Sequence, residues 1–127
     1  VGEFGERFAD MLAPYSKKIN NSLKSIAQKN DIQLHEGVYA GVFGPQLETR
    51  AEYRMLQILE VDAVGMSTVP EVIVAKHLNI PCAAISVVTD ECDPKNLSPV
   101  NIQEIIRIAG ETEPKMIILF KELIKHL

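Results

Sequence analysis

The chain has 127 residues, a size typical of one domain, and 46% of them are hydrophobic, enough to form a packed core. Its net charge of −4 argues against nucleic acid or an anionic membrane surface as a partner. No apolar run approaches the roughly 20 residues of a membrane span, and no signal peptide opens the sequence. We therefore expect a cytoplasmic protein whose two cysteines, Cys82 and Cys92, form no disulfide.

The first 29 residues combine a loop or short helix with one amphipathic helix. Phe4 and Phe8 belong to the loop, which Pro14 ends. The spacing of Ile19, Leu23 and their neighbours predicts a helix over about 15–29, with lysines on its other face.

Three short apolar runs in the centre of the chain end in clusters of polar residues. The runs are Val38–Phe43, Ala63–Met66 and Cys82–Val88, and helix-period segments separate them. Such runs are typical of strands in a largely parallel or mixed sheet flanked by helices, so the predicted class is α/β. Because ligands bind beyond the carboxyl ends of such strands, the polar clusters predict a site as well as a fold.

Two capping boxes predict where the helices between these strands begin. Thr49 with Glu52 opens a helix to about residue 59, and Thr68 with Glu71 opens another to about residue 78. A final helical region starts near residue 98. There Pro114 predicts a break between residues 110 and 115, followed by an amphipathic helix over 116–126.

Each predicted strand exit carries one candidate site residue. The Glu48 carboxylate can accept two N–H donors from a planar heterocycle, Ser67 precedes a helix N-terminus that favours anions, and Asp90 can pair with a ring nitrogen. The structural alternatives are an exposed loop acid, a helix-capping hydroxyl and a strand-end acid. No histidine lies near the acids around Asp90, and no nucleotide motif is present, so we expect neither metal nor cofactor.

Several of these segments resemble the trimeric purine nucleoside phosphorylases. They are Glu36–Tyr39, Gly44–Thr49 and above all Asp62–Glu71, with a further match at Phe4–Phe8. The resemblance covers nearly the whole chain and implies a phosphorylase-type fold. It corresponds to the C-terminal half of a family member, so residues 1–127 are expected to form part of a single nucleoside phosphorylase domain.

The resemblance implies a role for each matching residue and phosphorolysis of purine nucleosides to free base and ribose 1-phosphate, with phosphate as co-substrate. The implied catalytic residues are Glu48, at the N1 and N2 edge of the purine, and Asp90. The other implied substrate contacts are Phe8 from a neighbouring subunit of a homotrimer, Tyr39 and Met66 at the ribose, Leu47, Val64 and Gly65 at the base, and Ser67 at the phosphate.

Departures from the family leave the choice of purine open. Asp90 stands where 6-oxopurine enzymes carry asparagine and methylthioadenosine phosphorylases carry aspartate, whereas Glu48 favours a 6-oxopurine. Leu47 replaces a stacking aromatic, and Asn101–Gln103 replaces a histidine near the ribose. The alternatives are an adenosine-type phosphorylase or a non-catalytic purine-binding module. Without the phosphate-binding half, we expect the isolated chain to be inactive.

Overall fold

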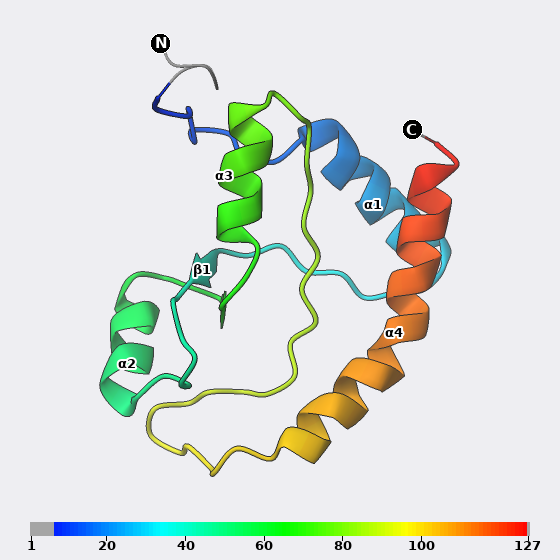
Figure 1. Ribbon diagram of the computed structural model, residues 1–127. Helices are drawn as coiled ribbons and strands as arrows, with labels where there is room; N and C mark the ends of the chain where they lie inside the picture. Colours follow the sequence, from blue (N-terminus) through cyan, green and yellow to red (C-terminus); the bar gives the residue numbers. More distant parts are fainter. Residues whose placement is uncertain (1–6, 127) are drawn as a thin grey trace.

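Figure 1 shows a computed structural model that describes residues 7–126, so Phe4 lies outside the described part. Four helices and two strands alternate along that part in an α/β order, as the sequence predicted. They are α1 (Lys17–Lys29), β1 (Tyr39–Gly41), α2 (Arg50–Ile58), β2 (Ala63–Gly65), α3 (Val69–His77) and α4 (Ile102–Ile124). The strands are shorter than predicted, but each lies inside its predicted apolar run.

The two strands pair in parallel, with α2 as the crossover between them. Gly41 lies opposite Gly65, and the Val42 amide donates to the Gly65 carbonyl at 2.9 Å. At the other end of the pair, the Asp62 Oδ2 accepts from the Val38 amide at 2.7 Å. This pairing brings the carboxyl ends of both strands, and the polar residues that follow them, to one edge.

The predicted third strand, Cys82–Val88, is wrong for the described residues. The segment runs through the middle of the molecule without strand structure (Figure 1). Its residues alternate between half-buried and exposed, as in an extended chain, so the period of two is present. A strand also needs a ladder of partner hydrogen bonds. The backbone bond at the start of this segment instead comes from the Ser16 amide to the Cys82 carbonyl at 2.8 Å.

Side-chain caps explain where most of the helices begin. The Ser16 hydroxyl caps α1, and the capping box of Thr49 and Glu52 at α2 is confirmed, with the Thr49 amide donating to the Glu52 carboxylate at 2.7 Å. The capping box predicted for Thr68 is wrong, because that side chain makes no cap hydrogen bond. Asn101 caps α4, where its side chain accepts from the Glu104 amide.

Helix α4 is continuous, so the predicted break near Pro114 is also wrong. Proline removes one backbone donor, and its ring crowds the carbonyl four residues earlier, that of Gly110. A methyl group added at Gly110 would meet no atom within 4 Å, so this turn has room to adjust. The Thr112 hydroxyl also donates to the Ile108 carbonyl at 2.9 Å. The helix therefore bends where it was expected to end (Figure 1).

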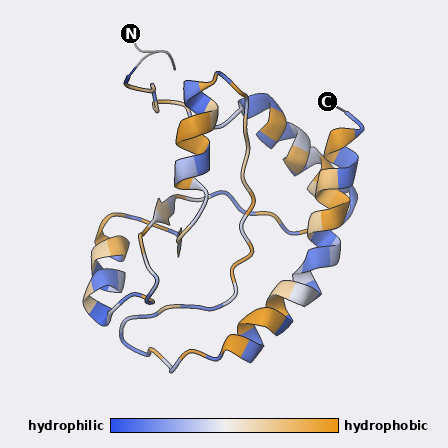
Figure 2. Ribbon diagram, in the orientation of Figure 1, coloured by the Kyte–Doolittle hydropathy of each residue, from blue (hydrophilic) through white to orange (hydrophobic). Residues whose placement is uncertain are grey.

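The hydrophobic core lies between α1 and the second half of α4. Its buried members are Leu23, Ile26, Ala27, Leu119 and Leu123. Hydrophobic residues also gather on the first half of α4 (Figure 2), where Ile106 is 66% exposed. Within residues 7–126, no helix is both long and apolar enough to cross a bilayer.

Candidate active site

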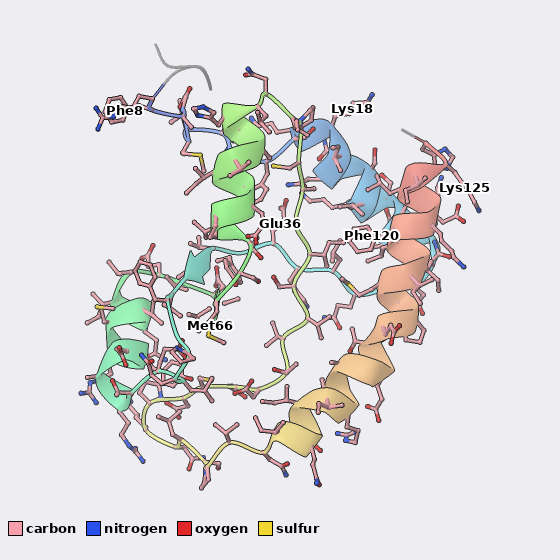
Figure 3. The ribbon with its side chains drawn as sticks, in the orientation of Figure 1. Phe8, Lys18, Glu36, Met66, Phe120 and Lys125 are labelled. Atoms are coloured by element: carbon pink, nitrogen blue, oxygen red, sulfur yellow. The ribbon has the colours of Figure 1, made fainter. Side chains whose placement is uncertain are left out.

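The polar segments after β1, β2 and the extended segment 82–88 line one cleft of about 1000 Å³. This volume is sufficient for a nucleoside-sized ligand. Met66 is one of the lining residues and lies beside the start of α3 (Figure 3). The predicted site residues in the lining are Tyr39, Leu47, Glu48, Val64, Gly65, Met66, Ser67 and Asp90. The two parallel strands and the extended segment thus bring together every predicted site residue except Phe8.

The turn from β2 into α3 is strained. Thr68 has φ 76° and ψ −53°, and the Val69 amide donates to the Ser67 carbonyl across it at 2.8 Å. These values describe a γ-turn of positive φ, which is rare for any residue and especially for a β-branched one. The turn leaves the Ser67 and Thr68 hydroxyls 3.3 Å apart on the cleft wall. Strain of this kind is common where a backbone must present groups to a ligand.

Two glycines let large side chains reach the cleft. A Cβ at Gly44 would lie 2.0 Å from the Met66 sulfur, and a Cβ at Gly65 would lie 2.4 Å from the Tyr39 hydroxyl. Gly44 also has a φ of 61°, which disfavours any other residue. Met66 and Tyr39 therefore occupy space that a side chain at either glycine would take.

Asp90 is held by hydrogen bonds to both of its carboxylate oxygens. The Thr89 hydroxyl donates to Oδ1 at 2.9 Å, and the Cys92 thiol donates to Oδ2 at 3.3 Å. Both donors belong to the chain segment that carries Asp90. These bonds fix the plane of the carboxylate and leave its remaining lone pairs to accept from a ligand.

Tyr53 from α2 and Cys92 from the loop after Asp90 line the same cleft as Glu48 and Asp90. Burial, followed by side-chain hydrogen bonding to Cys92 and to Glu48, raises the pKa of Tyr53 above its ordinary value. Burial also raises the pKa of the Cys92 thiol, the Tyr53 hydroxyl lowers it, and Asp90 raises it. Helical spacing alone gives Tyr53 an inward-facing position, and no sequence pattern gives Cys92 a role at the site.

The described lining of the cleft is acidic. It contains the five carboxylates of Glu48, Asp62, Asp90, Glu91 and Asp93, and no lysine, arginine or histidine. A phosphate dianion needs positive charge and several donors. This wall is therefore suited to a neutral ligand that carries N–H donors.

Arg50 fastens the acidic segment to α2. Its guanidinium Nη1 donates to the Pro94 carbonyl at 3.1 Å, over 44 positions of the chain. The loop that follows Asp90 is thereby tied to the helix that follows Glu48.

Phe8 lies away from this cleft. It is 85% exposed, it stacks under the Arg7 guanidinium at 5.7 Å, and it lies well away from Met66 (Figure 3). The chain therefore does not bring Phe8 to its own cleft.

Comparison with known proteins agrees with this arrangement. Residues 1–125 match the family described as "Phosphorylase superfamily". The chain belongs to the phosphorylase superfamily. Purine nucleoside phosphorylase 1 of Bacillus subtilis is 36% identical over 122 residues, which are 96% of this chain and 45% of the relative. The chain thus spans about half the length of the curated superfamily members that it matches.

Solved structures of the superfamily share the fold. A Schistosoma purine nucleoside phosphorylase in complex with hypoxanthine aligns with a TM-score of 0.91 and 33% identity, over 98% of this chain and 46% of that one. Isoform 2 of the Schistosoma mansoni enzyme, in complex with cytosine and ribose-1-phosphate, aligns with a TM-score of 0.92 and 40% identity over 98% and 45%. The predicted phosphorylase-type fold is confirmed.

Proposed function

We propose that this chain forms the nucleoside-binding wall of a purine nucleoside phosphorylase. The observation that carries the proposal is the single cleft in which Glu48, Met66, Ser67 and Asp90 meet from three separate segments. The acidic lining supports a ligand rich in N–H groups, as the edge of a purine is. The chain's membership of the phosphorylase superfamily supports phosphorolysis as the reaction class.

In the proposed reaction a phosphate oxygen attacks C1′ of the nucleoside while the bond from C1′ to N9 breaks. The electron pair of that bond stays on the purine, which takes up the proton that the attacking hydrogen phosphate gives up, and the products are neutral free base and ribose 1-phosphate. Glu48 accepts from N1–H, and the Asp90 carboxylate accepts from N7–H once the departing base has taken up a proton there. Met66 and Tyr39 contact the ribose, and Ser67 contacts the phosphate. Leu47, Val64 and Gly65 form the apolar walls of the base pocket. Catalysis is by position and electrostatics, with no covalent intermediate on the protein.

The proposed whole enzyme is a cytoplasmic homotrimer of purine salvage that needs no cofactor besides its co-substrate phosphate. The exposure of Phe8 supports its use in a neighbouring subunit's cleft. Assignment of residues 1–127 to the C-terminal half of the domain stays a prediction. The lack of basic residues in the described lining supports a separate source of phosphate-binding groups.

Calorimetric titration of the 127-residue chain with hypoxanthine and adenine tests the binding wall. We expect hypoxanthine to bind more tightly, and Glu48→Gln to weaken it about tenfold or more, because hydrogen bonds to charged groups are strong. Glu113→Gln, on the exposed surface of α4, is the matched control and should bind like the parent chain. A chain that binds neither base would refute the proposal, and a preference for adenine would favour the adenosine-type alternative.

A hybrid protein tests the reaction. In it, the chain replaces the matched 45% of the Bacillus subtilis relative, so that the other half supplies the rest of the site. We expect the hybrid to release hypoxanthine from inosine only when phosphate is present, and the isolated chain to release none. A folded, hypoxanthine-binding hybrid without turnover would favour the non-catalytic purine-binding module.

A further inference from the structure

The acidic loop, residues 89–97, contains a tight turn just after Asp90. The Asn96 amide donates to the Asp93 carbonyl at 2.9 Å, and the Asp93 carboxylate accepts from the Lys95 amide at 3.0 Å. Aspartate at the first position of a turn and proline at the second are the residues that this geometry favours. Pro94 is buried between two exposed neighbours, so the loop packs against the rest of the molecule at this residue.

Arg50 supplies a donor that the turn itself does not provide. The turn uses the carbonyl of its first residue, so the Pro94 carbonyl needs a partner from elsewhere. The Arg50 guanidinium Nη1 donates to this carbonyl at 3.1 Å, in a partly buried contact. Hydrogen bonds from a charged donor are stronger than neutral ones. The contact therefore favours one position of the acidic loop over others.

Arg50 and Glu48 extend from the same restrained piece of backbone. Thr49 lies between them and caps α2, where its amide donates to the Glu52 carboxylate at 2.7 Å and its hydroxyl accepts from the Glu52 amide at 3.3 Å. The capping box thus restrains the backbone that carries both side chains. The bond from Arg50 to the acidic loop consequently sets the position of Asp90 relative to Glu48.

Resting on the purine-binding function proposed above, we propose that Arg50 is a positioning residue for the base. Its bond to the Pro94 carbonyl holds the acidic loop at the cleft, so that Asp90 and Glu48 are in place before a purine arrives. A carboxylate that is already in place loses less conformational entropy on binding. Arg50 is not among the described residues that line the cleft, so it acts through Asp90 and not on the ligand.

The reactivity of Cys92 shows whether Arg50 holds the loop. Cys92 belongs to the acidic loop and is half-buried, whereas the Cys82 thiol donates to the Pro14 carbonyl and serves as a reference in the same chain. Arg50→Met removes every donor of the side chain. We expect alkylation of Cys92 by iodoacetamide at pH 8 to become about three- to tenfold faster, as the loss of one such hydrogen bond allows. Peptide mass spectrometry follows both cysteines, and the Cys82 rate should not change.

The direction of this change separates release of the loop from electrostatics. Loss of a positive charge would raise the pKa of a thiol and slow its alkylation, so a faster reaction reports exposure of Cys92. Arg54→Met is the matched control, because Arg54 is an exposed arginine one turn further along α2 and outside the described lining. It should leave both rates unchanged. An unchanged or slower Cys92 rate in Arg50→Met would overturn the proposal.

Hypoxanthine binding shows whether Arg50 acts through Asp90. We expect Arg50→Met to weaken binding about three- to tenfold in the parent chain. In an Asp90→Ala chain, where no carboxylate remains to be positioned, the same substitution should change binding less than about twofold. A merely structural role would lower the affinity equally in both backgrounds. Arg54→Met should bind like the parent, and circular dichroism confirms that each variant keeps its helices.

The outcomes separate this proposal from the proposed function. Equal losses in both backgrounds, or parent-like binding by Arg50→Met, would overturn the positioning role alone. If the parent chain binds no hypoxanthine, the proposed function fails and the positioning role with it, while the alkylation rates still decide whether Arg50 holds the loop.

Discussion

The α1–α4 core and the cleft differ in the residues that form them. In the core, apolar side chains such as Leu23 and Leu119 are almost fully buried against one another. In the cleft, carboxylates gather, Thr68 has a strained backbone, and glycines make room for larger neighbours. The core stabilises the fold, whereas the cleft retains features that a stability argument alone would remove. Substitutions in the core should therefore mainly lower stability, whereas substitutions in the cleft should mainly weaken ligand binding.

The largest expected effect is a loss of stability from the core. Leu119→Ala should lower the free energy of unfolding by about 2–5 kcal/mol, because Leu119 is 2% exposed and leaves a cavity. Urea unfolding followed by circular dichroism measures it. Ile106→Ala, on the exposed half of the same helix, should change stability by less than about 0.5 kcal/mol. Equal losses from both variants would contradict the assignment of the core.

Gly44→Ala should affect the cleft more than the fold. Its φ of 61° costs an L-residue about 1–2 kcal/mol, and the new methyl would displace the Met66 sulfur. We expect a moderate loss of stability together with weaker hypoxanthine binding. Gly110→Ala is the control, because a methyl group there meets open space, and it should leave binding unchanged. Normal hypoxanthine binding by Gly44→Ala would show that displacement of Met66 stays on the ribose side of the cleft and does not reach the base pocket.

Thr68→Gly should raise stability while it weakens binding, whereas Gly44→Ala should lower both. Relief of its strained backbone should stabilise the chain by about 1 kcal/mol, while the loss of a hydroxyl from the cleft wall should weaken ligand binding. Thermal unfolding measures the first effect and calorimetry the second. Thr49→Gly, at a helix cap with a φ of −71°, should lose stability instead. Destabilisation by both substitutions would mean that Thr68 stores no strain.

Alkaline pH should produce the smallest effect. Because the pKa of Tyr53 is raised in the folded chain, its neutral form stabilises the fold fully below the ordinary value of 10.0. That contribution is lost as the pH rises above this value. Urea midpoints at pH 8 and pH 11 should therefore differ more for the parent chain than for Tyr53→Phe. The same difference in both proteins would place the alkaline sensitivity elsewhere.

The sequence predicted which residues share one cleft better than it predicted the elements. Parallel strands end at one edge whatever their lengths, so Glu48 and Ser67 could be placed together, and Asp90 joins them from a run that is extended but is not a strand. The alternation of half-buried and exposed residues in Cys82–Val88 indicates an extended chain, but it does not show whether a partner strand lies beside it. The prediction of a third strand failed for this reason. The break at Pro114 failed because a proline can bend a helix without ending it, as it does in α4.

Tyr53 and Cys92 escaped prediction for another reason. Tyr53 fits the inward face of an amphipathic helix, and nothing in helical spacing separates a core tyrosine from one whose hydroxyl reaches a site. Cys92 lies in a loop, where no period applies. Tyr53 and Cys92 are 39 positions apart in the sequence, so only the folded structure shows that both line the same cleft.

The tie between Arg50 and Pro94 has a consequence for how the protein can vary. The acceptor is a main-chain carbonyl, so replacement of the side chain at position 94 leaves the acceptor atom in place. The donor, in contrast, exists only while arginine occupies position 50. Mutational tolerance across this contact should therefore be one-sided, broad at position 94 and narrow at position 50.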